Sequence, residues 1–426
     1  MTAVPLRAAA PEPIYAVLTT RTRPATWWEQ LATMLWVLCT FIEFPGNEFI
    51  LYPCALVFLG LYAIYRDVAF PVTLGALLLL AVPVLGTLSA GWSPDPVGAF
   101  RGGAMMILHF FIMVTVASRL TRQQIVRAVF FAGVVAIAFA APLINTFDTG
   151  GPYGSKNIFA IRMLICVLAA LAVAFEAKEH VLLRLFALPV LLVAFVFMLA
   201  ADSATALVFS VAGILIMTAL WMFWQPVTRV RHLRSFVLLV LVSAMAVGVL
   251  VLLANPDNRI VDEFLGSLGK DTTLTNRTII WEAGIRAAQE RPLFGLGFEG
   301  FWRDSTGAAQ TLNELDSKPF GTKLSFHNTY IEVWVALGYV GLIALIIAFA
   351  WSYLTTVIGW FKSQGMASSF LLTVATVILI STFTESYMLG TFDTLVFLFY
   401  IAPLTALAEK YHTGQRQYVR LRPNPD

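Results

Sequence analysis

Long apolar segments follow one another along most of the chain. A helix needs about 20 apolar residues to cross about 30 Å of hydrocarbon. We identify twelve candidate spans, which are 27–44, 49–65, 70–90, 98–117, 124–144, 157–175, 181–200, 203–223, 235–254, 327–350, 367–384 and 391–408. These segments are continuously apolar, whereas strands of a membrane barrel alternate apolar and polar residues. The pattern therefore predicts membrane-spanning helices.

Composition supports a membrane protein throughout. The 426 residues are 59% hydrophobic and 12% charged, with a mean hydropathy of +0.79, far from the averages of soluble domains. We expect one all-α polytopic membrane domain over 1–426, carrying a single insertion at 255–326. The net charge of +3 reflects topology, so we expect membrane lipids and no nucleic acid as partners.

Basic residues predict how the chain is oriented. Alternate connections hold nearly all Lys and Arg, for example at 119–127 and 229–234, while the short connections on the other side contain only Lys156. Cytoplasmic loops retain positive charge. Both termini are therefore expected in the cytoplasm, and the insertion is expected on the opposite side of the membrane.

The insertion gathers ionisable groups beside the membrane. A helix is predicted from about residue 274, with Thr275 or Asn276 as its cap and Pro292 as its stop. This places Arg277 in the first turn, where a basic side chain opposes the helix dipole. An anionic ligand would compensate, and so would a nearby carboxylate or a lipid phosphate. The following segment, 293–302, alternates glycine with large apolar residues, which suits a turn whose backbone lies close to a neighbour.

His327 lies at the junction of the insertion and the next span, and Glu332 follows inside the apolar run. Of the five histidines, only His109 and His327 fall where they can reach the non-cytoplasmic half of the membrane. A histidine with a pKa near neutral can accept a proton from a hydroxyl. An interfacial hydrogen-bonding role is the alternative for His327.

Several segments together resemble a known family. They are Asn276-Arg277-Thr278-Ile279-Ile280-Trp281, Arg291-Pro292-Leu293-Phe294-Gly295-Leu296-Gly297, His327-Asn328-Thr329-Tyr330-Ile331-Glu332, Gly154-Ser155-Lys156-Asn157 and Asp202-Ser203-Ala204-Thr205-Ala206-Leu207. Their order and spacing around a large loop resemble the O-antigen ligase and Wzy-type polymerase superfamily. The resemblance covers roughly 154–342.

The resemblance implies a metal-independent glycosyltransferase of the bacterial inner membrane with its active site facing the periplasm. The donor would be a glycan on undecaprenyl pyrophosphate. The leading expectation is an O-antigen ligase of lipopolysaccharide biosynthesis, whose acceptor is a sugar of lipid A-core. A Wzy-type O-antigen or exopolysaccharide polymerase is the alternative. By the same resemblance, catalytic His327 would activate the acceptor hydroxyl and Arg277 would hold the pyrophosphate, with inversion at the anomeric carbon.

Further cations are candidates for the pyrophosphate. Lys156 and Arg162 lie at and below the start of one span, and Arg101 lies near the non-cytoplasmic end of another. Many family members carry an arginine where this chain has Ala204, so one phosphate-binding arginine is missing. The Lys-Asn form at 156–157 and the Thr-Asn-Arg-Thr form at 275–278 are similar to the exopolysaccharide polymerases.

The remaining charged groups are expected to form structural pairs. They are Asp202, Glu282, Arg286, Glu332 and Glu385. No Asp-x-Asp or His/Cys cluster predicts a metal site, and no cofactor is expected. A transporter for lipid-linked sugars is the alternative from another class. Transporters usually show internal repeats and polar sites at mid-membrane, whereas this chain gathers polar residues at the ends of spans.

Overall fold

The computed structural model describes residues 24–42, 44–153, 155–222, 274–303, 305–315 and 318–420, and these ranges contain helices and no strand. The predicted ninth span, 235–254, and the start of the insertion lie outside them.

The α-helices are α1 (Trp27–Phe41), α2 (Glu48–Ile64), α3 (Arg66–Gly75), α4 (Ala81–Leu88), α5 (Pro96–Arg119), α6 (Arg122–Ala140), α7 (Lys156–Phe175), α8 (Val181–Ala200), α9 (Ala204–Met222), α13 (Leu274–Glu290), α14 (Gly307–Leu315), α15 (Thr329–Lys362), α16 (Met366–Ser381) and α17 (Thr394–Arg420). The 3₁₀ helices are η1 (Leu77–Leu80), η2 (Ser89–Gly91), η3 (Ala141–Thr149), η4 (Gly151–Tyr153) and η5 (Tyr387–Leu389). The all-α prediction is confirmed.

Six helices in the described ranges are long and apolar enough to cross a membrane, and a seventh span exists if the bent pair α2 and α3 is counted as one. Three shorter apolar helices, at 77–91, 207–221 and 366–381, add to them. The multi-pass membrane class is supported, but the count of twelve is not established. The largest difference concerns the predicted span 70–90, which the structure divides among α3, η1, α4 and η2.

The cause of that division is local. Gly75 ends α3, and Pro83 in the first turn of α4 lacks the backbone N–H that would bond back to Leu79 in a continuous helix. Pro71 lies inside α3 and does not interrupt it. The chain also bends by 99° between α2 and α3. This region therefore forms short helical pieces instead of one straight span.

Helix α15 is broken at Gly338, where φ is 65° and ψ is −166°. Backbone groups from the insertion fill the break. The Tyr339 N–H donates to the carbonyl of Pro292 at 2.8 Å, and the Leu296 N–H donates to the carbonyl of Val335 at 2.8 Å. The predicted single span at 327–350 is thus two helical pieces held by a loop.

Glycines allow this close approach, as the glycine-rich pattern of 293–302 predicts. A Cβ on Gly295 would stand 2.6 Å from the carbonyl oxygen of Val335, and one on Gly297 would stand 2.5 Å from Ser93 Cβ. Both glycines also have positive φ. The loop therefore packs between α15 and the residues just before α5.

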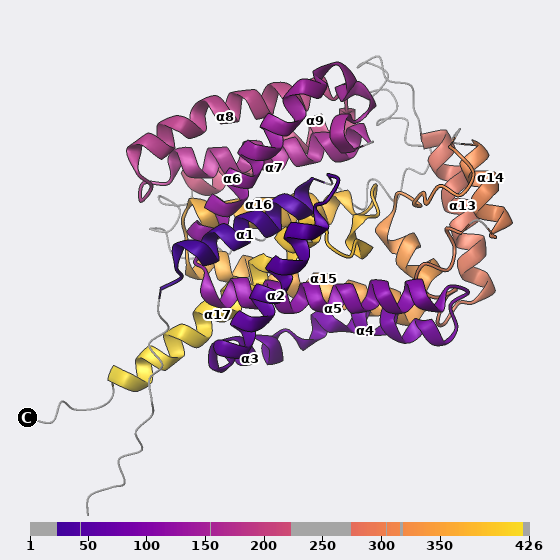
Figure 1. The fold of residues 1–426 in the computed structure, drawn as a ribbon, viewed down its shortest axis with the longest axis horizontal. Helices are drawn as coiled ribbons and strands as arrows, with labels where there is room; N and C mark the ends of the chain where they lie inside the picture. Colours follow the sequence, from indigo (N-terminus) through magenta and orange to yellow (C-terminus); the bar gives the residue numbers. More distant parts are fainter. Residues whose placement is uncertain are drawn as a thin grey trace, which may run out of the picture.

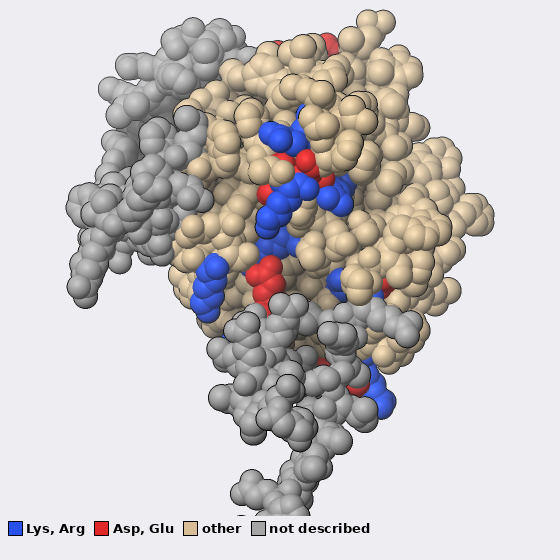
Figure 2. All heavy atoms as spheres, turned by 90° about the vertical axis from the view of Figure 1, so that its left-hand side faces the viewer, with Lys and Arg blue, Asp and Glu red and all other residues tan. Residues whose placement is uncertain are grey.

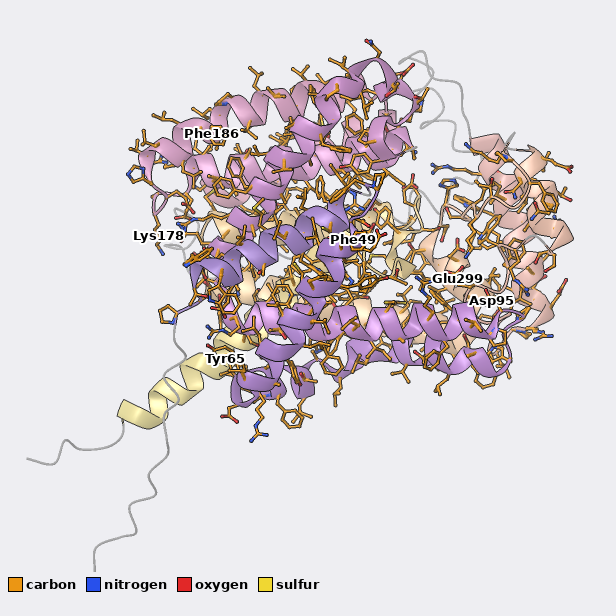
Figure 3. All side chains as sticks on the ribbon, in the orientation of Figure 1. Phe49, Tyr65, Asp95, Lys178, Phe186 and Glu299 are labelled. Atoms are coloured by element: carbon orange, nitrogen blue, oxygen red, sulfur yellow. The ribbon has the colours of Figure 1, made fainter. Side chains whose placement is uncertain are left out.

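The bundle has two distinct ends (Figure 1). Helices α13 and α14 lie at one end, which we call the insertion end, and the last turns of α17 lie at the opposite end, which we call the basic end. Figure 3 labels Asp95 and Glu299 at the insertion end and Lys178 at the basic end. Helix α7 is the most completely buried of the six spans, and α16 packs against α7, α9, α15 and α17.

The basic end carries a band of mixed charge across its surface (Figure 2). Its arginines are paired with carboxylates. Arg119 contacts Glu29 at 2.6 Å, and Arg127 contacts Glu179 at 2.7 Å. The residues that predict orientation thus also tie helices together at this end.

Candidate active site

Three polar side chains from distant parts of the sequence converge on Glu385, in the connection between α16 and α17. One carboxylate oxygen lies 3.2 Å from His327 Nδ1, and the other lies 3.4 Å from Arg277 Nη2. The Asn157 amide donates to Glu385 at 3.1 Å and accepts from the Ser203 hydroxyl at 2.8 Å. Glu385 is therefore the hub of the cluster.

This cluster joins four of the segments that carry the family resemblance. Asn157 lies at the start of α7 and Ser203 directly precedes α9, while Arg277 lies in α13 and His327 directly precedes Asn328, the cap of α15. Glu385 belongs to none of these segments, and the sequence predicts only a structural pairing role for it. Its one sequence signal is a carboxylate in a short polar connection between two apolar segments.

Hydrogen bonds between backbone groups and side chains fix the distance between His327 and Glu385. The Asn328 N–H donates to the Ser386 hydroxyl at 2.8 Å, and the Thr329 hydroxyl donates to the carbonyl of Glu385 at 2.7 Å. Asn328 also caps α15 with its side-chain oxygen. The start of α15 and the Glu385 loop therefore form one unit.

His327 occupies a strained backbone position and points its ring at a carboxylate. Its φ is 50°, in the left-handed region that non-glycine residues adopt at a cost of about 1–2 kcal/mol. Such strain persists where the surroundings enforce it, often in active sites. In the neutral tautomer that donates Nδ1–H to this carboxylate, Nε2 carries the lone pair. The side chain is 33% exposed, so an external hydroxyl can reach it.

Arg277 has the compensating partner that its position requires. Its guanidinium donates to the Thr384 carbonyl at 3.1 Å and contacts Glu385 at 3.4 Å. A nearby carboxylate was one of the alternatives left open by the sequence, and the structure contains it. Helix α13 begins at Leu274, so Thr275 and Asn276, the predicted cap residues, lie within its first turn.

Lys156 and Arg101 are both exposed, but they have different surroundings. Lys156 is the first residue of α7 and adjoins Asn157 of the cluster, and no ion pair or hydrogen bond to its side chain occurs among the described residues. Arg101 lies in α5, and no interaction joins it to Glu385 in the part of the chain that the structure describes. Lys156 is thus the better placed of the two for an anion bound at the cluster.

Arg162 lies deeper in α7 and is already paired. Its Nη2 donates to the Asp393 carboxylate at 2.5 Å, and its side chain is only 6% exposed. Asp393 also accepts from the Leu395 N–H and so caps α17. The structure therefore gives Arg162 a carboxylate partner inside the bundle, in place of an open position at the insertion end.

Tyr387 lies between these two carboxylates. Burial raises its pKa well above the usual range, and the nearby charges of Glu385 and Asp393 raise it further. The phenol is therefore neutral, and it is hydrogen-bonded to the Ser381 hydroxyl. It is a polar contact within the α16–α17 connection.

The other predicted charged pairs have mixed outcomes. Glu282 and Arg286 face each other at 3.8 Å on the exposed side of α13, as expected for a structural pair. Glu332 instead accepts hydrogen bonds from the Trp302 indole at 2.9 Å and the Phe326 N–H at 2.8 Å. No group of three or more potential metal ligands occurs among the described residues.

Comparison with known proteins agrees with this convergence of motifs. A family model described as O-Antigen ligase matches residues 189–346. The exopolysaccharide production protein ExoQ of Rhizobium meliloti (strain 1021) is 26% identical over 275 residues. Both similarities support a relation of the chain to the O-antigen ligase/Wzy-type superfamily.

The matched regions are partial. The match to ExoQ spans 63% of this chain and 62% of that superfamily member. An uncharacterized protein of Haemophilus influenzae is 29% identical over 127 residues, which cover 28% of this chain and 31% of the other. The segment matched by the superfamily model includes Ser203, Arg277 and His327, while Asn157 and Glu385 lie outside it.

Proposed function

We propose that this chain is a membrane glycosyltransferase that moves a glycan from a polyprenyl pyrophosphate to an acceptor hydroxyl. The observation that carries the proposal is the His327–Glu385 contact beside Arg277. It combines an oriented general base with a cation for an anionic leaving group. The relation to this superfamily supports the same reaction class.

The chemistry is a single displacement at the anomeric carbon. The acceptor oxygen attacks that carbon while His327 Nε2 removes the hydroxyl proton. The bond between the anomeric carbon and the pyrophosphate oxygen breaks, and its electrons stay on the pyrophosphate. Glu385 stabilises the imidazolium that forms, as the third group does in other base-assisted nucleophiles. Attack opposite the leaving group inverts the anomeric configuration.

Cations stabilise the departing pyrophosphate. Arg277 offers a planar fork suited to phosphate oxygens, and Lys156 offers a point charge. With His327 neutral, the two cations outweigh the single carboxylate of Glu385, so the cluster favours an anionic donor. Arg162, held by Asp393, is assigned to support of the α16–α17 connection.

The first candidate is an O-antigen ligase that uses undecaprenyl-pyrophosphate-linked glycan as donor and a lipid A-core sugar as acceptor. The description of the matching family model supports it. The second candidate is a polymerase that transfers the glycan to another lipid-linked repeat unit. The similarity to an exopolysaccharide production protein and the Lys-Asn and Thr-Asn-Arg-Thr forms at 156–157 and 275–278 favour this second acceptor.

We also propose that the protein lies in the bacterial inner membrane with the insertion end facing the periplasm. The Lys and Arg residues within the band of mixed charge at the opposite end (Figure 2) support this orientation. Single cysteines introduced at Lys178 and at Glu299 would test it. A membrane-impermeant thiol reagent should label only the Glu299→Cys variant in intact spheroplasts, and the reverse pattern would refute the orientation.

The decisive experiment is an in vitro reaction with purified protein and undecaprenyl-pyrophosphate-linked glycan, with chelator present. One tube contains lipid A-core and the other only more donor. Product on lipid A-core identifies a ligase, and lengthened donor chains identify a polymerase. If neither forms while the protein moves the donor across vesicle membranes, the enzyme proposal fails and a transporter replaces it.

A further inference from the structure

The backbone on both sides of His327 is held by side chains that the reaction itself does not use. The Phe326 carbonyl accepts from the Trp281 indole N–H at 2.9 Å, and the Phe326 N–H donates to Glu332 at 2.8 Å. On the other side, the Asn328 N–H donates to the Ser386 hydroxyl at 2.8 Å. The Trp281 and Ser386 contacts orient the two peptide planes that flank His327, and the Glu332 contact holds the peptide plane before them.

Orienting both planes determines the conformation of the residue between them. The φ and ψ angles of His327 describe how the preceding and following peptide planes are rotated about its Cα. With the Phe326 carbonyl and the Asn328 N–H both fixed, the φ of 50° is enforced from outside the residue. Without such bonds, a histidine would relax toward negative φ, because the left-handed region is unfavourable for a side chain with Cβ.

Glu332 holds the backbone one peptide group before the planes that flank His327. Its carboxylate accepts from the Phe326 N–H at 2.8 Å, and the Trp302 indole donates to its other oxygen at 2.9 Å. The carboxylate also interacts with the side chain of Ser386, whose hydroxyl accepts from the Asn328 N–H. One carboxylate thus holds Phe326 and interacts with the side chain that holds Asn328.

Side-chain packing also holds Phe326 in place. The Phe326 ring is fully buried and lies 4.9 Å, centroid to centroid, from both Phe301 and Trp302. A Cβ on Gly284 of α13 would stand 2.8 Å from this ring, so the helix lies directly against it. The ring, the N–H and the carbonyl of Phe326 are therefore all anchored.

We propose that Trp281 and Glu332 are positioning residues that hold His327 in its left-handed conformation and so aim its imidazole at Glu385 and the acceptor. The catalytic consequence rests on the proposed function. A misplacement of about 1 Å in a reacting group can lower a rate about 100-fold. Loosening this anchor should therefore lower kcat while leaving donor binding at Arg277 and Lys156 intact.

The chain offers a matched control for the indole. Trp334 lies in the same apolar cluster as Phe326, and its Nε1 is buried with no hydrogen-bond partner in the described structure. Trp281→Phe and Trp334→Phe each remove one indole N–H from a half-buried side chain, but only the Trp281 N–H bonds to Phe326. Glu332→Gln, with Glu282→Gln as its exposed control, removes the shared carboxylate without changing its size.

The experiment measures two independent quantities on purified, folded variants. The first quantity is the transfer rate. We expect Trp281→Phe to lower kcat about tenfold and Glu332→Gln to lower it at least as much. The donor KM of both variants should stay within twofold of the wild-type value. The second is the rate at which diethyl pyrocarbonate modifies His327, read by mass spectrometry. We expect both variants to change it more than twofold, and Trp334→Phe to change neither quantity.

Each outcome is decisive. Equal behaviour of Trp281→Phe and Trp334→Phe in kcat and in His327 modification would overturn the positioning role. If Glu332→Gln does not fold, Trp281→Phe and Ser386→Ala provide the same test with smaller changes. Should His327→Ala remain fully active, the proposed function fails instead, and the modification rates alone then decide whether Trp281 and Glu332 hold His327.

Discussion

Glu385 lies 58 residues beyond His327 in the chain, yet its Oε2 is 3.2 Å from the imidazole Nδ1. The same carboxylate faces Arg277 with its other oxygen. One side chain therefore orients the proposed base and holds the proposed phosphate ligand. This dual contact makes Glu385 the first residue to change.

Glu385→Gln should lower kcat by at least about tenfold. A glutamine can turn its amide N–H₂ toward Nδ1, which would move the histidine proton to Nε2 and remove the lone pair that accepts the acceptor proton. Transfer kinetics with purified protein measure this effect. Glu282→Gln, an exposed carboxylate on α13, is the control, and equal kinetics in the two variants would refute the role of Glu385.

His327→Gln should lower the transfer rate about 10²–10⁴-fold, the usual contribution of a positioned general base. Glutamine retains hydrogen-bonding capacity but cannot accept a proton. The control is His180→Gln at the basic end, where the imidazole accepts from the Leu182 N–H at 3.3 Å. Near-normal turnover of His327→Gln would leave this histidine with only the interfacial hydrogen-bonding role.

Arg277→Lys should raise the donor KM about tenfold, because a lysine cannot present two parallel N–H groups to a phosphate. Isotope-labelled donor binding and initial-rate kinetics both report the change. Arg286→Lys lies on the same helix with its side chain 68% exposed, so its KM should match the wild type. If Arg277→Lys binds donor normally, Arg277 serves only to pair with Glu385.

Arg162→Met should destabilise the protein by about 3–5 kcal/mol, because it leaves the Asp393 carboxylate without its partner. Thermal unfolding in detergent measures the loss. The double variant Arg162→Met with Asp393→Leu should recover much of it, since both charges are then absent. An unchanged melting temperature with a raised donor KM would instead show that Arg162 binds pyrophosphate.

Gly338→Ala should destabilise the protein by at least about 1–3 kcal/mol from backbone strain alone. Gly338 has φ of 65°, and an added Cβ would stand 2.3 Å from the carbonyl of Leu293. Gly60→Ala in α2 meets nothing within 4 Å and should be neutral or slightly stabilising. Equal melting temperatures for the two variants would mean that the 292–297 loop does not fill the break in α15.

Sequence patterns predicted most of the helices, because apolar length is a local property. The run after 156 becomes α7, and the helical spacing after 274 becomes α13, which ends at Glu290 before Pro292. Hydrophobic patterns failed to predict the structure where contacts with distant residues override the local helix preference. Helix α15 breaks at Gly338 because a loop from another part of the chain supplies the backbone bonds that the break removes.

The sequence by itself determined the class of the protein, the superfamily motifs, and the choice of His327 and Arg277 as candidates, since these depend on composition and on short spacings. Only the tertiary structure decided that Glu385 contacts both of them and that Arg162 forms an ion pair with Asp393. It also decided that Trp281 and Glu332 form hydrogen bonds to the backbone beside His327. Apart from the Glu332–Phe326 bond, these contacts join residues 45 to 231 positions apart. They depend on how helices pack, which short-range patterns do not encode.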